Sequence, residues 1–113
     1  MLSIRFDKEH EWWVSGRVFE RLFLSALEHG ELAPSLEDWR HVADANGGFS
    51  LARLEPAIAH DLTAGLRAAA SSELARLGAV DLQTEDGTYK ISLEKLLVIT
   101  DGVTFSIDST IDT

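Results

Sequence analysis

The chain has 113 residues, of which 45% are hydrophobic and 26% are charged, the size and composition of one ordinary globular domain. It contains no cysteine, which excludes disulfide frameworks and zinc sites with thiolate ligands. Its net charge of −9 repels phosphate backbones and anionic lipids. We therefore expect a single soluble domain over residues 1–113 that binds neither nucleic acid nor membrane. Because no apolar run has the length of a signal peptide or a membrane span, a cytoplasmic location is expected.

The N-terminal segment predicts a short strand followed by a helix. Apolar and polar side chains alternate over residues 2–6, which is the period of a half-buried strand. Over residues 16–29 the apolar positions recur with the helical period and form one continuous stripe. Ser15 can cap the first turn of this helix, and Gly30 can end its last turn.

Two further helices are expected in the middle of the chain. The first covers residues 36–45, and Ser35 with Asp38 approximates a capping box in front of it. The second is a long helix from Pro56, which suits a first turn, to Gly78. The apolar stripe of the long helix drifts around its axis, so this helix either bends or is covered on two faces.

The C-terminal third has the pattern of β-hairpins. Residues 80–91 are expected to form one hairpin, and residues 96–107 a second one that turns at Asp101-Gly102. Residues 108–113 are expected to be loose. The order of strand, three helices and hairpins predicts an α+β domain whose helices pack on one small antiparallel sheet, with the N-terminal strand pairing with the C-terminal hairpin.

Several chemistries are excluded because their motifs fail. His10-Glu11 resembles the start of a zinc-protease helix, but the second histidine would have to stand where Val14 is. A calcium loop counted from Asp81 has its glycine one residue late, and Ser92 replaces the bidentate glutamate. Neither a nucleophile elbow nor a phosphate-binding glycine loop is present. We therefore expect no catalytic residue, no metal site and no cofactor.

The candidate binding residues combine aromatic side chains with one polar helix face. They are Trp12, Trp13, Asp38, Trp39, His41 and Asp44. In an extended segment two adjacent tryptophans point to opposite sides, so one is expected in the core and the other on a second surface. The two aspartates lie three residues on either side of His41, within hydrogen-bonding reach of its imidazole. The simpler interpretation is a solvated helix face above a core anchored by tryptophan.

The first hypothesis for function is a non-enzymatic, acidic protein-interaction domain of the inhibitor, immunity or chaperone-like kind. Its partner would be a protein with a basic surface, because opposite charge steers association. The alternative is a small-molecule-binding protein or an unrecognised enzyme, with a pocket lined by Trp12, Trp13, Trp39 and His41.

A third hypothesis is a winged-helix DNA-binding domain, because three helices followed by a hairpin have that order. It is disfavoured because residues 56–70, which would be the recognition helix, offer only Arg67 as a cation, and the expected wing is acidic. Leu24 on the outer side of the first helix, together with the two-faced long helix, suggests a homodimer formed through helices.

Overall fold

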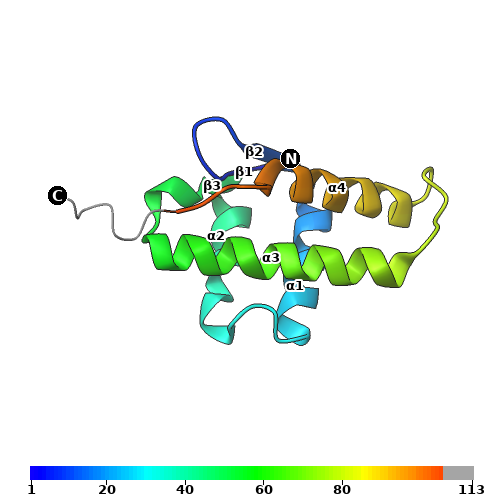
Figure 1. Cartoon of the computed structure of the whole chain (residues 1–113), viewed down its shortest axis with the longest axis horizontal. Helices are drawn as coiled ribbons and strands as arrows, with labels where there is room; N and C mark the ends of the chain where they lie inside the picture. The colour runs from blue at the N-terminus through cyan, green and yellow to red at the C-terminus, as the bar shows by residue number, and fades with distance from the viewer. Residues whose placement is uncertain (106–113) are drawn as a thin grey trace.

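The computed structural model describes residues 1–105 and shows an α+β domain in which four α-helices pack on a small mixed sheet of three strands (Figure 1). The strands are β1 (Leu2–Arg5), β2 (Glu11–Val14) and β3 (Gly48–Ser50). The helices are α1 (Gly16–Glu28), α2 (Asp38–Asn46), α3 (Pro56–Leu77) and α4 (Glu85–Thr100), with short 3-10 helices η1 (Pro34–Leu36) and η2 (Leu51–Arg53). Figure 1 shows α3 along the length of the molecule, with α4 beside its C-terminal half.

The sheet has the order β2-β1-β3, with β1 in the centre. The strand predicted at residues 2–6 is confirmed, but its predicted partner is wrong: β1 pairs antiparallel with β2 and parallel with β3. Strand β3 approaches β1 very closely at Gly48, where an added Cβ would lie 1.9 Å from the carbonyl oxygen of Ser3. Only glycine leaves room for β3 to pair at this position.

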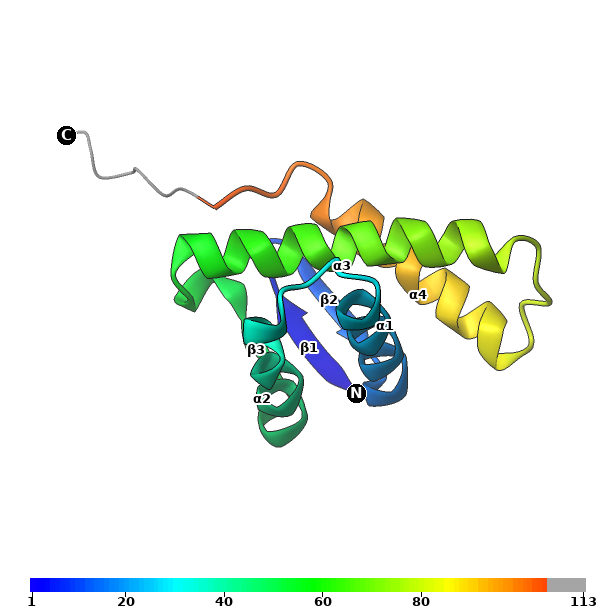
Figure 2. The same cartoon turned by 90° about the horizontal axis from the view of Figure 1, so that it is seen from below.

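The helices predicted at residues 16–29 and from Pro56 to Gly78 are confirmed as α1 and α3. Ser15 caps α1 as expected, since its hydroxyl accepts a hydrogen bond from the amide of Val18 at 3.1 Å. Figure 2 shows α1 and α2 side by side and running across α3. The predicted helix at 36–45 begins later, at Asp38, because the residues before it form the 3-10 helix η1.

The capping box predicted at Ser35 and Asp38 is wrong. Glu37 occupies the N-cap position of α2, and no side chain accepts a hydrogen bond there. Because Ser35 lies inside η1, it is already part of a helical turn when α2 begins. The αL conformation of Gly47, with φ of 72°, ends α2 and starts the turn into β3.

The two C-terminal hairpins are wrong, since Glu85–Thr100 forms the single helix α4. Thr84 caps this helix through a hydrogen bond from the amide of Gly87 to its hydroxyl, at 3.1 Å. Two acidic residues in the first turn also favour a helix, because negative charge stabilises the N-terminal end of the helix dipole. Thr84, Glu85 and Asp86 therefore start a helix at the place where the hairpin over residues 80–91 would turn.

The second predicted hairpin, over residues 96–107, is also wrong, because its first half belongs to helix α4. Asp101-Gly102 is a turn that follows α4, and residues 103–105 form no strand. Residues 106 and 107, with the tail at 108–113 that was expected to be loose, lie outside the described residues.

The winged-helix hypothesis needed a hairpin as its wing, and the segment that would supply it forms α4. Arg67 is also engaged within the fold, because its guanidinium donates a hydrogen bond to the carbonyl of Leu97 at 2.9 Å. This bond ties α3 to the C-terminal end of α4. The one cation that the supposed recognition helix offered therefore has an intramolecular partner.

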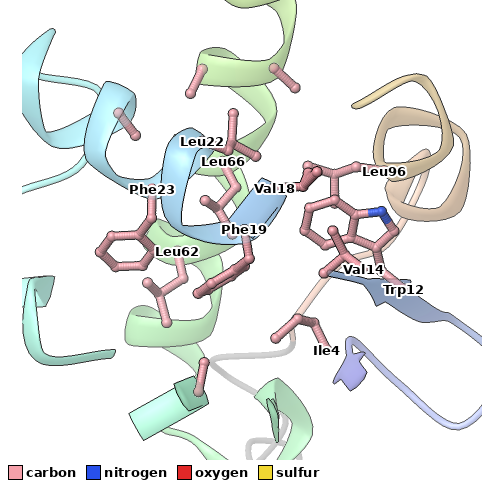
Figure 3. Packing of buried hydrophobic residues seen from close by; sticks show 14 of the residues in the cluster. Ile4, Trp12, Val14, Val18, Phe19, Leu22, Phe23, Leu62, Leu66 and Leu96 are labelled. Atoms are coloured by element: carbon pink, nitrogen blue, oxygen red, sulfur yellow. The ribbon is translucent and has the colours of Figure 1, made fainter. Parts of the chain in front are cut away.

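The core lies between the inner face of the sheet and the helices, and each layer supplies large apolar side chains (Figure 3). Trp12 of β2 lies beside Leu96 of α4 and the first turns of α1. Phe19 links the layers, with its ring centroid 6.4 Å from that of Trp12 and 5.5 Å from that of Phe23. Trp12 is therefore part of the structural core of the domain.

Candidate functional site

One face of the sheet is turned away from the helices and carries mostly polar side chains. We call it the outer sheet face and define it by Ser3, Arg5, Glu11, Trp13 and Ser50, which alternate along the strands with buried or half-buried apolar residues. The large aromatic residue on this face is Trp13, of which 60% is exposed. Such an exposed fraction is unusual for tryptophan, which is highly buried on average in folded proteins.

The orientation of Trp13 is fixed by its buried neighbour. Trp12 is only 1% exposed, and its indole nitrogen donates a hydrogen bond to the carbonyl of Ser92 in α4 at 3.1 Å. Since successive side chains of a strand point to opposite faces, anchoring Trp12 inside places Trp13 outside. The prediction that one tryptophan belongs to the core and the other to a second surface is confirmed.

Polar contacts surround Trp13 on the outer sheet face. The carboxylate of Glu11 accepts a hydrogen bond from the hydroxyl of Ser3 and forms an ion pair with Arg5 at 3.4 Å. In the register of the sheet, Ser3 lies directly opposite Trp13, and Arg5 lies opposite Glu11. These contacts run across the β1–β2 pair, so the surroundings of Trp13 are held by the strands rather than by a loop.

His41 and Asp44 lie together at a cavity of about 310 Å³ between the start of α1 and α2. Arg40 also lines this cavity, and its guanidinium forms an ion pair with Glu20 at 2.9 Å. Within residues 1–105, no hydrogen bond joins His41 to Asp38 or Asp44. The carboxylate–imidazole contacts expected from the spacing are therefore not formed.

The predicted aromatic pocket is not assembled either. Trp39 packs against Phe49 of β3, with ring centroids 5.4 Å apart, and Asp38 is exposed at the start of α2. None of the three tryptophans lines the cavity of His41. They lie in three different places: the core, the outer sheet face and the contact between α2 and β3.

A buried polar cluster connects α3 with α4, and sequence reasoning missed it. The hydroxyl of Tyr89 donates a hydrogen bond to the carboxylate of Glu73 at 2.7 Å, and Arg76 forms an ion pair with the same carboxylate at 2.9 Å. The guanidinium of Arg21 lies 3.9 Å from the centre of the Tyr89 ring. No local pattern places Tyr89 beside Glu73, because the contact depends on residues 85–100 forming a helix that packs on α3.

The electrostatics of this cluster indicate a structural role. Burial raises the pKa of Tyr89, and the hydrogen bond and charge of Glu73 raise it further. A phenol with a raised pKa stays protonated at neutral pH and keeps donating to the carboxylate. It is therefore poorly suited to act as a base or nucleophile near pH 7.

His10 takes part in the turn between β1 and β2. Its imidazole lies 2.6 Å from the carboxylate of Asp7, and this hydrogen bond lowers the pKa of Asp7. The same carboxylate accepts a hydrogen bond from the amide of Glu9 at 2.8 Å. The histidine that resembled a metal ligand thus forms part of an Asx-type turn.

The described part of the chain offers no group of three or more histidine, aspartate or glutamate side chains that could hold a metal ion. Among the same residues, no helix has the length and apolar character needed to span a membrane. No family model, no curated protein and no solved structure matches the chain. Function is therefore inferred from the geometry around Trp13.

Proposed function

We propose that this protein is a non-enzymatic interaction domain that binds another protein through the outer sheet face, with Trp13 as the central contact. The observation that carries the proposal is the 60% exposure of Trp13 on a face that the helices leave open. Tryptophan is strongly enriched among the residues that dominate binding energy in protein interfaces. Ser3, Arg5 and Glu11 supply the polar rim that such an anchor normally has.

The charge of the chain supports a partner with a basic surface. A net charge of −9 attracts cationic proteins over a distance and accelerates their association. This is the electrostatic character of inhibitors, immunity proteins and chaperone-like partners, and we place the present protein in that class. The proposal includes a cytoplasmic location, because a chain without cysteine has no disulfide bond that reducing conditions could break.

The test compares the full-length protein with two single variants as bait in extracts of the source cell. Trp13→Ala removes the proposed anchor, and Leu24→Ala removes another exposed apolar side chain, on α1, which is 43% exposed. We expect one protein to be captured by the wild type and by Leu24→Ala but not by Trp13→Ala. Binding of that purified partner should weaken at least about tenfold on Trp13→Ala, the loss typical of an interface hot spot.

Raising the salt concentration should slow association with the purified partner, because screening weakens electrostatic steering. The proposal is wrong if Trp13→Ala, shown to be folded by circular dichroism, retains every partner of the wild type with unchanged affinity. It is equally wrong if the chain catalyses a reaction on a small molecule and captures no protein.

A further inference from the structure

Helix α4 has two apolar faces, of which only one is used by the fold. Tyr89, Leu93 and Leu96 are buried against the rest of the domain. On the opposite side, Ile91 is 36% exposed and Val98 is 76% exposed. These two residues are seven apart, which is two helical turns, so they lie on one line along the helix.

Two charged residues stand between them and complete a surface that we call the outer α4 stripe: Ile91, Glu94, Lys95 and Val98. The stripe borders a shallow groove of about 260 Å³, to which Ile99 also contributes. Figures 1 and 2 show α4 at the outside of the molecule, with α3 along one side of it. Nothing in the described part of the chain covers Val98.

Packing within the monomer does not explain the exposed β-branched residues of the stripe. Isoleucine and valine have lower helix propensity than alanine or leucine, and Val98, which is 76% exposed, gains little burial in return. A helix that is apolar on opposite sides is normally covered on both. The stripe therefore has the composition of a contact surface.

The charges of the stripe favour a second copy of this chain as its occupant. Two copies that each carry −9 repel one another, so they can meet only where the surface is locally neutral. Glu94 and Lys95 supply one charge of each sign and make the stripe neutral. A strongly basic partner would gain nothing from this surface, because it would meet Lys95 as well as Glu94.

The positions of these charges determine how two copies of α4 can pair. Glu94 and Lys95 flank the line from Ile91 to Val98 on opposite sides, because adjacent helical residues are about 100° apart. In a parallel pair with two-fold symmetry, Glu94 of each copy lies beside Lys95 of the other. In an antiparallel pair, Glu94 would face Glu94 and Lys95 would face Lys95.

We propose that the protein self-associates through parallel pairing of α4 about a two-fold axis, with Ile91 against Ile91 and Val98 against Val98. A two-fold interface must be complementary to itself, as this stripe is in the parallel arrangement. One helical stripe is smaller than a standard interface, so the dimer forms weakly and in a concentration-dependent manner. The surface is distinct from the outer sheet face, and its use is independent of Trp13.

The first experiment measures the mass of the full-length protein by sedimentation velocity over a series from about 10 μM to about 1 mM. The wild type should shift from monomer to dimer within this range, and Val98→Glu should stay monomeric. Leu24→Glu is the matched control, because it places the same charge at an exposed leucine on α1 and should dimerise as the wild type does. Circular dichroism should show the helical content of both variants unchanged.

Charge variants test the parallel orientation. Glu94→Lys and Lys95→Glu should each weaken the dimer by at least about tenfold, and the double exchange should restore it, because opposite charges meet again. In an antiparallel pair each of these residues faces its own copy before and after every exchange, so neither single variant would weaken the dimer, and that result would overturn the proposed orientation.

The absence of cysteine from the chain allows a direct positional test. Val98→Cys should form a disulfide-linked dimer under mild oxidation, and Leu24→Cys, its matched control, should remain monomeric. The proposal fails if the wild type is monomeric throughout the concentration series, or if both cysteine variants cross-link equally. Trp13→Ala should dimerise normally, so failure of the proposed function leaves this result unaffected.

Discussion

At the scale of the residue, Trp12 and Trp13 are neighbours in the chain with opposite surroundings. Trp12 is enclosed by Phe19 and Leu96 and has a hydrogen-bond partner for its indole nitrogen. Trp13 has most of its ring in water. Strand alternation was enough to predict this division, but the sequence did not show which of the two faces inward. That depends on the position of α4, which supplies the carbonyl of Ser92.

We expect the two tryptophans to contribute unequally to stability. Trp12→Ala should lower the free energy of unfolding by about 3–5 kcal/mol, because it leaves a cavity in the core. Trp13→Ala should lower it by less than about 1 kcal/mol, since little buried surface is lost. Urea denaturation of both variants measures the difference. Equal and large losses would show that Trp13 is structural, and would remove the main support for the outer sheet face as an interface.

At the scale of the element, α1 and α3 could be predicted from the sequence, whereas α4 and the sheet partners could not. Apart from Leu24, the large apolar residues of α1 lie on one side, so its period is clear. The apolar residues of α4 lie on opposite sides, and several of them are β-branched, which resembles strand composition. β3 is three residues long and begins with glycine, so no local pattern identifies it.

Gly87 shows why the hairpin expected over residues 80–91 does not form. It lies in the first turns of α4, where the preceding loop passes very close. An added Cβ at this position would lie 2.4 Å from the carbonyl oxygen of Asp81 and from the Cα of Leu82. The glycine is required by this close approach rather than by a turn.

We therefore expect Gly87→Ala to destabilise the protein by about 1–3 kcal/mol, the usual range for overpacking, although alanine is the better helix former. Gly16→Ala is the matched control, because Gly16 also lies in the first turn of a helix and has open space around its Cα. That substitution should leave stability unchanged or raise it by up to about 1 kcal/mol. Thermal unfolding of both variants measures the contrast, and equal effects would show that the loop can move away.

At the scale of the whole molecule, side-chain contacts connect elements that lie far apart in the sequence. Tyr89 joins α4 to α3 through Glu73, Arg67 joins α3 to the end of α4, and Trp12 joins the sheet to α4. None of these contacts could be inferred from local patterns, because each depends on α4 being a helix. The polar cluster around Tyr89 is therefore not visible in the local pattern of residues 85–100.

The raised pKa of Tyr89 predicts how the whole domain responds to alkali. Above about pH 10, the unfolded chain loses the phenol proton while the folded protein retains it, so the free energy of unfolding falls as the pH rises. The loss from this group should approach about 1.4 kcal/mol per pH unit, and it should be absent below about pH 9. Urea denaturation across this pH range measures the slope.

Tyr89→Phe is the control, and its unfolding free energy should depend less steeply on pH above about 10 than that of the wild type. Since the chain contains a single tyrosine, the ultraviolet absorbance of phenolate reports on this residue alone. Phenolate should form together with unfolding. Its appearance in protein that is still folded, near the ordinary tyrosine pKa, would contradict the prediction.

The mixed pairing of the central strand also determines the order in which the sheet can form. A short turn connects β1 to β2 on one edge. The other edge of β1 pairs with β3, which follows α1 and α2 in the chain. A hairpin of β1 and β2 can form within microseconds, whereas closure of the longer loop is slower. On a ribosome, the free edge of β1 therefore stays open until Ser50 has been synthesised and released. During that interval the nascent chain is most exposed to pairing with the edge strands of other chains.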